Sequence, residues 1–320
     1  MDVLSDVLSW IRVEGTLTRR SELTAPWGFS HPPNQYISFL FVETGSCFLR
    51  RPQEQALLIE AGDLVMFTPG GQVALADHPS TPLIPYAQVL KTHGPELADR
   101  YAPDREAFPT LRYGGGGRLT AIRAWGLRFD GYAQHPLLAQ LPPLIHFTYE
   151  KRSALPWLET TLRFLMHETH HKSDGSEMMS VRLIDLLFVQ VIRAWFREQP
   201  DGEAGWLGAL RDPSIGHVLG LMHQYPADPW TVHGLANAVG MSRSSFSARF
   251  QSLVGSPPLT YLTQVRMNLA AIALKGDARV SLTEAANQVG YDSESSFGRA
   301  FKRHFGVSPG AFRKEQAGPV

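Results

Sequence analysis

One short pattern is written twice near the carboxyl end of this 320-residue chain, and it constrains the fold more than any other feature. The first copy covers residues 235–261 and the second covers residues 282–312. Both contain Ala-x-x-Val-Gly, then two phenylalanines four residues apart, then glycine, proline and a final aromatic residue. The offset between the copies is 50 residues from Ala236 to Ala286 and 51 beyond the turn, so the second turn holds one extra residue.

Each copy has the spacing of a helix-turn-helix. Gly240 and Gly290 fall where the first helix should end in a left-handed residue, and Ser242 and Ser293 are placed to cap the second helix. The paired phenylalanines put both rings of the second helix on one inward face. The opposite face is expected to carry Ser244, Ala248 and Gln251 with Ser247 at its edge in the first copy, and Ser295, Arg299 and Lys302 with Arg303 beside them in the second.

A helix that buries two aromatic rings and turns small polar and basic groups outward has the format of a recognition helix for the DNA major groove. One copy alone would also fit an ordinary helical hairpin, whereas two copies in register favour DNA binding. Arg299 is the predicted base contact, because arginine can bind guanine O6 and N7 together. Arg249, Lys302 and Arg303 are predicted phosphate contacts. The predicted DNA-binding residues are Ser242, Arg243, Ser244, Ser247, Arg249, Glu294, Ser295, Ser296, Arg299, Lys302 and Arg303.

The segment between the copies predicts a connecting helix. Apolar residues at helical spacing run from Pro258 to Leu274, and Gly276 follows just past the expected end. A helix of about 16 residues spans roughly 24 Å. It would hold two recognition helices on one side of a duplex, about one helical turn apart.

The second copy and the segment PPLTYLTQVRMNLAAIAL resemble the AraC/XylS family of bacterial transcriptional regulators. Positions that match the family's signature are Ala286, Gly290, Ser296, Phe297, Phe301, Phe305, Gly306, Pro309 and Arg313. The resemblance implies a cytoplasmic regulator with double-stranded promoter DNA and RNA polymerase as partners. Activation is the expected direction of control, with repression left open.

The charge distribution agrees with DNA binding only after it is divided by region. The whole chain has 30 basic and 30 acidic residues, but the part from Asp212 onward carries ten basic and seven acidic ones. This gives a net charge of +3 there and −3 in the remainder. With so small a surplus, phosphate binding must come from the placement of charges more than from bulk charge, so non-specific DNA affinity is expected to be weak and strongly salt-dependent.

The length suits two or three domains, and the amino-terminal part reads as many short strands separated by glycine and proline turns. The stretch EAGDLVMFTPGG resembles a conserved motif of cupins, in which Gly62, Asp63 and Gly70 form turns between strands. The predicted fold class is α+β, with an amino-terminal cupin-like β-barrel, a helical appendage and a carboxyl-terminal all-α tandem helix-turn-helix domain. The expected boundaries are 1–150 for the barrel, 151–200 for the helical segment, 201–212 for the linker and 213–315 for the DNA-binding domain.

Metal-dependent cupins bind their ion through histidines that point into the barrel. Here the later ligand position falls at or near Val73, and the earlier strand offers residues 38–41, which are Ser-Phe-Leu-Phe. We therefore expect no metal and no cofactor. An apolar interior is expected instead, in which a small organic effector binds. The candidate lining residues are Trp27, Phe29, Tyr36, Phe39, Phe41, Phe67 and Trp125. The alternative is that they simply form the core, since about half of them must point inward in any barrel.

Three further motifs favour structural roles. His167-Glu168-Thr169-His170-His171 matches the H-E-x-x-H spacing of zinc peptidases, but it ends a helix and is followed at once by a polar loop. The glycine run 114–117 lacks the lysine and the helix of a phosphate loop. Cys47 lies in a predicted strand and is the one cysteine of the chain, so a buried, inert thiol is expected.

Residues 156–199 predict two amphipathic helices, and the second has an apolar stripe wide enough to bury on two sides. One side is expected to pack on the barrel and the other on a second subunit, which makes a homodimer. The alternative is that the whole stripe is buried within one chain. Two other functions stay open at this point, namely an enzyme of the cupin oxygenase or zinc hydrolase type and a regulator without an effector. No membrane-spanning or secretory segment is expected.

Overall fold

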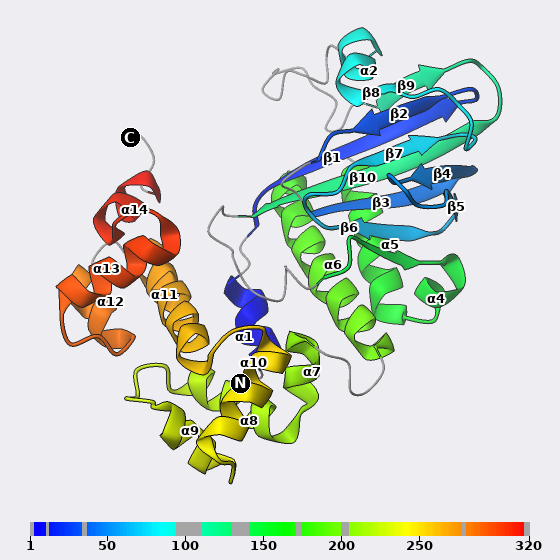
Figure 1. The fold of residues 1–320 in the computed structure, drawn as a ribbon. Coiled ribbons are helices and arrows are strands. Elements are labelled where there is room, and N and C mark those ends of the chain that lie inside the picture. Colours follow the sequence, from blue (N-terminus) through cyan, green and yellow to red (C-terminus); the bar gives the residue numbers. More distant parts are fainter. Residues whose placement is uncertain are drawn as a thin grey trace. The chain divides into compact units, whose positions relative to one another are not determined.

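The computed structural model describes residues 3–10, 13–33, 37–93, 110–129, 141–170, 174–199, 205–276 and 280–316. The chain forms two compact units. The barrel unit consists of Val13–Asp130 and Leu141–Glu198, and the helical unit consists of Met1–Arg12, Gly131–Gln140 and Gln199–Val320. The α+β fold class expected from the sequence is confirmed (Figure 1). No helix among the described residues is long and apolar enough to span a membrane.

The barrel unit is built from two sheets. One sheet has the strand order β11-β6-β3-β10-β1-β9 and the other has the order β5-β4-β7-β2-β8. Most neighbouring strands are antiparallel, while β1 with β9 and β2 with β8 are parallel pairs. The strands are β1 (Val13–Thr24), β2 (Gly28–His31), β3 (Ile37–Thr44), β4 (Ser46–Arg50), β5 (Leu57–Glu60), β6 (Leu64–Phe67), β7 (Val73–Ala76), β8 (Ile84–Pro85), β9 (Thr110–Gly114), β10 (Leu119–Phe129) and β11 (Leu144–Phe147).

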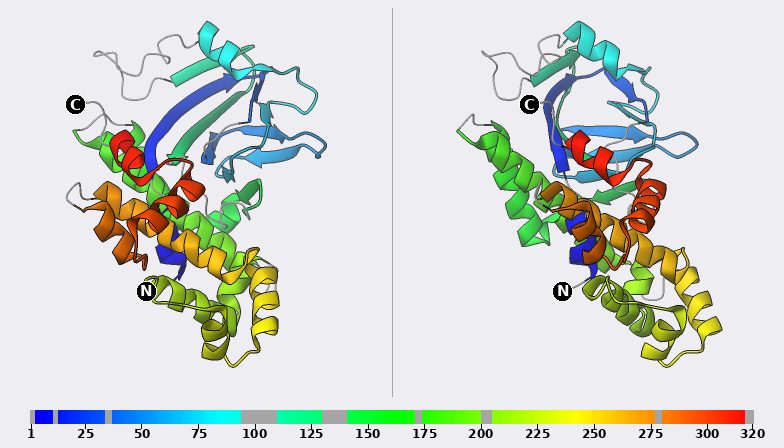
Figure 2. Two further views of the ribbon diagram at one scale, coloured as in Figure 1. Left: turned by 60° about the vertical axis from the view of Figure 1, so that its left-hand side comes forward. Right: turned by 90° about the vertical axis from the view of Figure 1, so that its left-hand side faces the viewer.

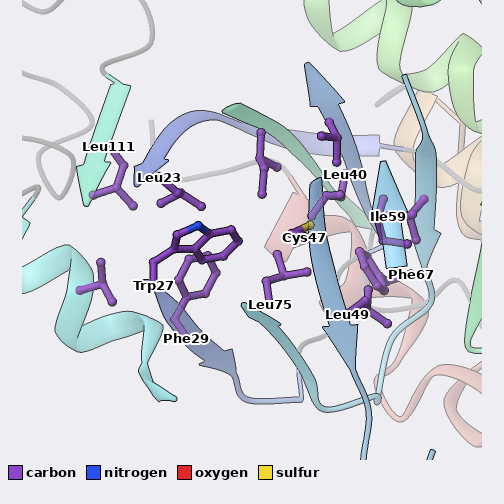
Figure 3. Packing of buried hydrophobic residues seen from close by; sticks show 14 residues of the cluster. Leu23, Trp27, Phe29, Leu40, Cys47, Leu49, Ile59, Phe67, Leu75 and Leu111 are labelled. Carbon is purple, nitrogen blue, oxygen red and sulfur yellow. The ribbon is translucent and has the colours of Figure 1, made fainter. Parts of the chain in front are cut away.

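The two sheets enclose a common apolar core, which we call the barrel interior (Figure 3). Helix α2 (Tyr86–His93) adds Val89 to this core. The buried members are Leu23, Trp27, Phe29, Leu40, Val42, Cys47, Leu49, Ile59, Val65, Phe67, Leu75, Val89, Leu111 and Ile122. The members on β3 are Leu40 and Val42, which lie two residues apart because alternate side chains of a strand share one face.

The turn between β5 and β6 has the conformation expected from the cupin-like motif. Gly62 has a φ of +90°, which glycine adopts without the penalty that other residues pay. The buried Asp63 carboxylate accepts hydrogen bonds from the backbone N–H groups of Glu60 (3.1 Å) and Tyr149 (2.8 Å) and contacts His146 Nε2 at 2.9 Å. One carboxylate therefore joins this turn to β11 and to helix α4 (Tyr149–Ser153).

Two long helices, α5 (Pro156–His170) and α6 (Ser176–Glu198), pack against each other, and α6 packs on β1 and β10. They match the two amphipathic helices predicted from the sequence. The contact of this helical pair with the sheet includes Arg123, which is nearly fully buried and donates to Thr169 Oγ1 at 2.6 Å. Arg123 also pairs with Glu43 at 2.6 Å, and Glu43 accepts a second bond from Arg20 at 2.8 Å. The buried guanidinium is thus matched by a carboxylate and a hydroxyl, as a buried charge requires.

Among its described residues, the helical unit contains one helix before the barrel unit in the sequence and eight after it. They are α1 (Val3–Trp10), α7 (Trp206–Arg211), α8 (Pro213–Gln224), α9 (Val232–Ala238), α10 (Arg243–Val254), α11 (Pro258–Gly276), α12 (Leu282–Gln288), α13 (Glu294–Phe305) and α14 (Pro309–Gln316). Two features differ from the expectation. Helix α1, which the sequence grouped with the barrel, packs on α8 and α11, and the segment expected to be a linker contains α7 with Trp206 fully buried.

A cluster of polar aromatic groups is buried where α1, α7, α8 and α11 meet. The Tyr261 hydroxyl accepts the indole N–H of Trp206 at 3.3 Å and lies 2.9 Å from Nε2 of His223. The Asp6 carboxylate of α1 lies 3.5 Å from the other ring nitrogen of His223. Burial lowers the pKa of His223 to about 4 despite the nearby carboxylate, so the imidazole is neutral at physiological pH.

The neutral state of His223 predicts a loss of stability in acid. An unfolded chain protonates this imidazole below about pH 6.5, whereas the folded chain resists protonation until about pH 4. The free energy of unfolding should therefore fall as the pH decreases through this window, by at most about 3 kcal/mol from this residue. Urea denaturation at pH 7.5 and pH 5 measures the difference. His223→Gln should reduce it, whereas His217→Gln on the exposed face of the same helix should leave it as in the wild type.

Candidate functional site

The two helix-turn-helix motifs share the same turn. In both, the residue after the glycine donates its backbone N–H to the carbonyl of the alanine, from Met241 to Ala236 at 2.9 Å and from Tyr291 to Ala286 at 3.0 Å. Both glycines have a positive φ, +65° at Gly240 and +78° at Gly290. Ser242 and Ser293 cap the second helices as predicted, and Asp292 is the extra residue that delays the second cap.

The first recognition helix, α10, divides cleanly into an inner and an outer face. Phe246 and Phe250 are fully buried with their ring centroids 5.7 Å apart, and Phe250 also contacts Tyr261. The outer face exposes Ser244, Ala248 and Gln251, while Ser247 is half-buried at its edge. Ser244, Ser247 and Ala248 offer single hydrogen bonds and a methyl contact to DNA bases.

The second recognition helix, α13, has the same division with more charge. Phe297 and Phe301 are fully buried and join Phe305 and Phe312 in one aromatic core. The outer face exposes Ser295, Arg299, Lys302 and Arg303. No described carboxylate forms an ion pair with any of these three basic residues. Their charges are available to a polyanion.

Several predicted DNA-binding residues already have partners within the protein. Arg249 pairs with Asp212, the capping residue of α8, through Nε at 2.8 Å and through Nη2. Glu294 accepts a hydrogen bond from Thr283 at 2.9 Å, which holds the start of α13 against α12. Ser242 and Ser296 take part in the caps of α10 and α13. Arg243 is exposed at the first position of α10.

Sequence reasoning missed Arg266, which joins the two motifs. From the middle of α11 its guanidinium donates to the carbonyl oxygens of Pro226 (2.7 Å) and Asp228 (2.8 Å) and lies over the ring of Tyr291 at 5.8 Å. Pro226 and Asp228 belong to the loop before α9, whereas Tyr291 belongs to the turn of the second motif. The available signal was that Arg266 is the one charged residue of the connecting segment before Lys275. Figure 2 shows α11 running between the two helical bundles.

Gly290 brings the two motifs into direct contact. A Cβ atom at this position would lie 2.5 Å from the carbonyl oxygen of Ala227, which belongs to the same loop that Arg266 holds. The second turn therefore rests against the first subdomain without room for a side chain. Together, Arg266 and Gly290 fix how the two recognition helices are oriented with respect to each other.

The structure separates the candidate effector-binding residues into two groups. Trp27, Phe29 and Phe67 belong to the barrel interior. Phe39, Phe41 and Trp125 are buried but do not belong to it, because they alternate with interior residues and lie on the other face of their sheet. Arg152 of α4 lies over the Phe41 ring at 5.5 Å, which marks that face as the one covered by helices. Tyr36 lies outside the described residues.

Both parts of the chain match known protein families. A cupin family model matches residues 2–197, and a helix-turn-helix domain model matches residues 235–315. An AraC-like transcription regulator of Streptomyces antibioticus is 30% identical over 318 residues, which are 98% of this chain and 99% of that protein. The chain belongs to the AraC family of DNA-binding transcription regulators.

Two further relatives of this AraC-family chain cover parts of it. The transcriptional regulator AlkR of Acinetobacter baylyi is 38% identical over 200 residues, which are 62% of this chain and 64% of AlkR. The DNA-binding domain of AdpA, solved in complex with a target DNA, is 33% identical and covers 32% of this chain and 92% of the AdpA chain, with a TM-score of 0.31.

The barrel of this AraC-family regulator does not fit a cupin metal centre. The described residues contain no group of three or more His, Cys, Asp or Glu side chains that could hold an ion. Val73, at or near the later ligand position, and Leu40, one of the four residues that the earlier strand offers, pack into the apolar interior. Cys47 is fully buried there, and burial raises the pKa of its thiol to about 12, which suppresses its reactivity.

The H-E-x-x-H motif, at the end of α5, contributes to packing in this AraC-family chain. Thr169 within the motif is buried against Arg123, while His167 points outward with 67% of its side chain exposed. The last histidine of the motif, His171, lies outside the described residues. The glycine run 114–117 forms the turn from β9 to β10, where Gly115 and Gly117 donate to the carbonyl oxygens of Thr24 and Ala25 at 2.8 Å.

The close approach at Gly290 yields a test with a matched control. Gly240→Ala should lower the free energy of unfolding by about 1 kcal/mol, because the left-handed conformation is unfavourable for alanine. No further loss is expected, since nothing lies within 4 Å of the new Cβ. Gly290→Ala should cost about 2–4 kcal/mol, because overpacking against the Ala227 carbonyl adds to the same penalty. Chemical denaturation of both variants measures the difference. Equal losses would show that the two motifs are not held in contact.

Proposed function

We propose that this AraC-family chain is a sequence-specific regulator that reads two successive major-groove segments with α10 and α13. The observation that carries this proposal is the exposed polar face of each recognition helix, opposite a fully buried pair of phenylalanines. The contact through Arg266 and Gly290 supports simultaneous reading, because it fixes the spacing of the two helices. RNA polymerase is the proposed protein partner at the promoter.

The two half-sites are proposed to differ in stringency. Arg299 stands at the centre of the outer face of α13 without a described acidic partner, which suits a bidentate bond to guanine. On the outer face of α10, Ser244, Ser247 and Ala248 can offer single hydrogen bonds or a methyl contact but no bidentate bond. Arg249 is proposed to contact phosphate less strongly than Lys302 or Arg303, because its positive charge is partly offset by the carboxylate of Asp212.

The Arg299 assignment is tested after an operator has been selected from random DNA with the full chain. Arg299→Ala should weaken binding by about 1–3 kcal/mol and relax selectivity at one base pair. Lys302→Ala should weaken binding evenly across sequences and reduce the salt dependence, as the loss of a phosphate contact does. Fluorescence anisotropy over a set of single-base operator variants separates the two patterns. An unchanged base preference in Arg299→Ala would refute the base contact.

The regulator is also proposed to respond to a small organic effector in the barrel interior. The support is the apolar, aromatic lining of that interior and the absence of a metal-binding group among the described residues. The indole Nε1 of Trp27 is buried there without a hydrogen-bond partner among the described atoms. An unsatisfied buried donor is costly unless something accepts from it.

A homodimer through α5 and α6 completes the proposal. The inner face of α6 is buried in the barrel unit, but four large apolar side chains of the pair remain outside: Phe164, Met178, Met179 and Leu186 are each more than 45% exposed. Apolar side chains gathered on one pair of helices are typical of a subunit interface.

Replacement of one of these residues by a charge tests the dimer. Leu186→Glu should convert the dimer into a monomer, because a buried carboxylate without a partner opposes association. Leu119→Glu is the matched control, since Leu119 is also about half exposed but lies on β10. Size-exclusion chromatography with light scattering measures the mass. A wild-type monomer, or a Leu186→Glu dimer, would contradict the proposed interface.

A further inference from the structure

An arginine of β1 faces the barrel interior without a carboxylate partner. Leu23 belongs to the interior and Ser21 is buried, so the alternation of the strand puts Arg19 on the same face. Among the residues that the structure describes, no carboxylate pairs with Arg19. Arg20, on the opposite face, pairs with both Glu22 and Glu43. Within the described residues, the charge of Arg20 is therefore balanced by carboxylates, whereas the charge of Arg19 is not.

Arg19 is held at a group of aromatic rings. Its Nη1 donates to the Tyr86 hydroxyl at 3.0 Å, and its Cζ lies 5.7 Å from the Tyr86 ring centroid. The Tyr86 centroid is 4.2 Å from that of His31 and 4.9 Å from that of Phe29. Trp27 continues the group at 5.6 Å from Phe29. We call Arg19, Trp27, Phe29, His31 and Tyr86 the Arg19 cluster.

The Arg19 cluster carries one positive charge and spare hydrogen-bond donors. Burial, reinforced by the charge of Arg19, lowers the pKa of His31 to about 4, so this ring is neutral at physiological pH. The Arg19 fork presents five N–H donors in a plane, of which one is bonded to Tyr86. The Trp27 indole N–H is buried without a partner among the described atoms. Such a set of groups suits an acceptor-rich ligand with a single negative charge.

The chemistry of the cluster narrows the effector further. A guanidinium matches a carboxylate through two parallel hydrogen bonds, and one cation balances one carboxylate better than a doubly charged phosphate. Flat aromatic faces favour a flat aromatic partner. Resting on the proposed effector control of the barrel, we infer that the effector is a small aromatic monocarboxylate whose carboxylate is bound by Arg19 and whose ring packs against Phe29 and Tyr86.

The inference is tested by calorimetric titration of the full chain with pairs of probes that differ only in charge. The probes are phenylacetate and 4-hydroxyphenylacetate, each against its neutral amide. The carboxylates should bind about 10- to 100-fold more tightly than the amides, as expected for a charge-assisted hydrogen bond pair. Arg19→Gln should remove this preference, and Arg19→Lys should keep part of it, because the charge remains while the fork is lost.

A matched control uses an arginine on the outer face of the neighbouring strand. Arg112 on β9 is 76% exposed and pairs with Glu22, so Arg112→Gln should keep the full preference for carboxylates. Circular dichroism of each variant verifies the fold. Equal binding of acids and amides, retention of the preference by Arg19→Gln, or failure of every carboxylate to bind at millimolar concentration would each overturn the inference.

Failure of this inference and failure of the proposed function give different results. If the same preparations bind the selected operator and native mass spectrometry finds a neutral molecule in the barrel, effector control stands and only the carboxylate assignment falls. If the chain binds no operator sequence in preference to random DNA, the proposed regulator function fails whatever the titrations show.

Discussion

The burial of two phenylalanines, four residues apart, on each recognition helix is the constraint on which the rest of the helical unit depends. Each ring removes a large apolar surface from water, and its loss from a packed core typically costs about 3–5 kcal/mol. Two such anchors on a 12-residue helix fix its rotation about its own axis. The face that meets solvent is thereby determined, and with it the side chains that DNA can meet. The aromatic core of the first motif continues through Tyr261 to His223 and Asp6.

The sequence predicted features whose physical signals are local. Helical periodicity, capping serines and turn glycines act within one or two helical turns. The sequence therefore predicted both motifs, the connecting helix and the extra residue of the second turn. Contacts between distant positions leave no such signal. The pairing of Arg249 with Asp212 spans 37 residues and that of Arg266 with Pro226 spans 40. The assignment of α1 to the helical unit is of the same kind, because its apolar face shows that it is buried but not where.

The barrel illustrates a different limit. The lining residues were predicted from their aromatic character. The face of the sheet to which a side chain points depends instead on its position in the strand, because successive side chains alternate between the two faces. Leu40 and Val42 take the interior face of β3, which leaves Phe39 and Phe41 for the face under the helices. In the pairing of β3 with β10, Thr44 and Val42 lie opposite the consecutive residues Ala121 and Ile122, so Glu43 is an extra residue of β3 and the alternation counted from the start of that strand shifts there. Arg19 on β1 and His31 on β2 were not predicted at the interior, because polar residues on a strand usually face water.

The place of α1 bears on how the polypeptide matures on the ribosome. Val7 is buried, and α1 packs on α8 and α11, which begin at residues 213 and 258, so α1 is synthesised long before the helices that cover its apolar side. During that interval the strands of the barrel unit, which start at Val13, can already pair. The helical unit can therefore be completed only after the strands of the barrel unit, which lie between its parts in the sequence, have been synthesised.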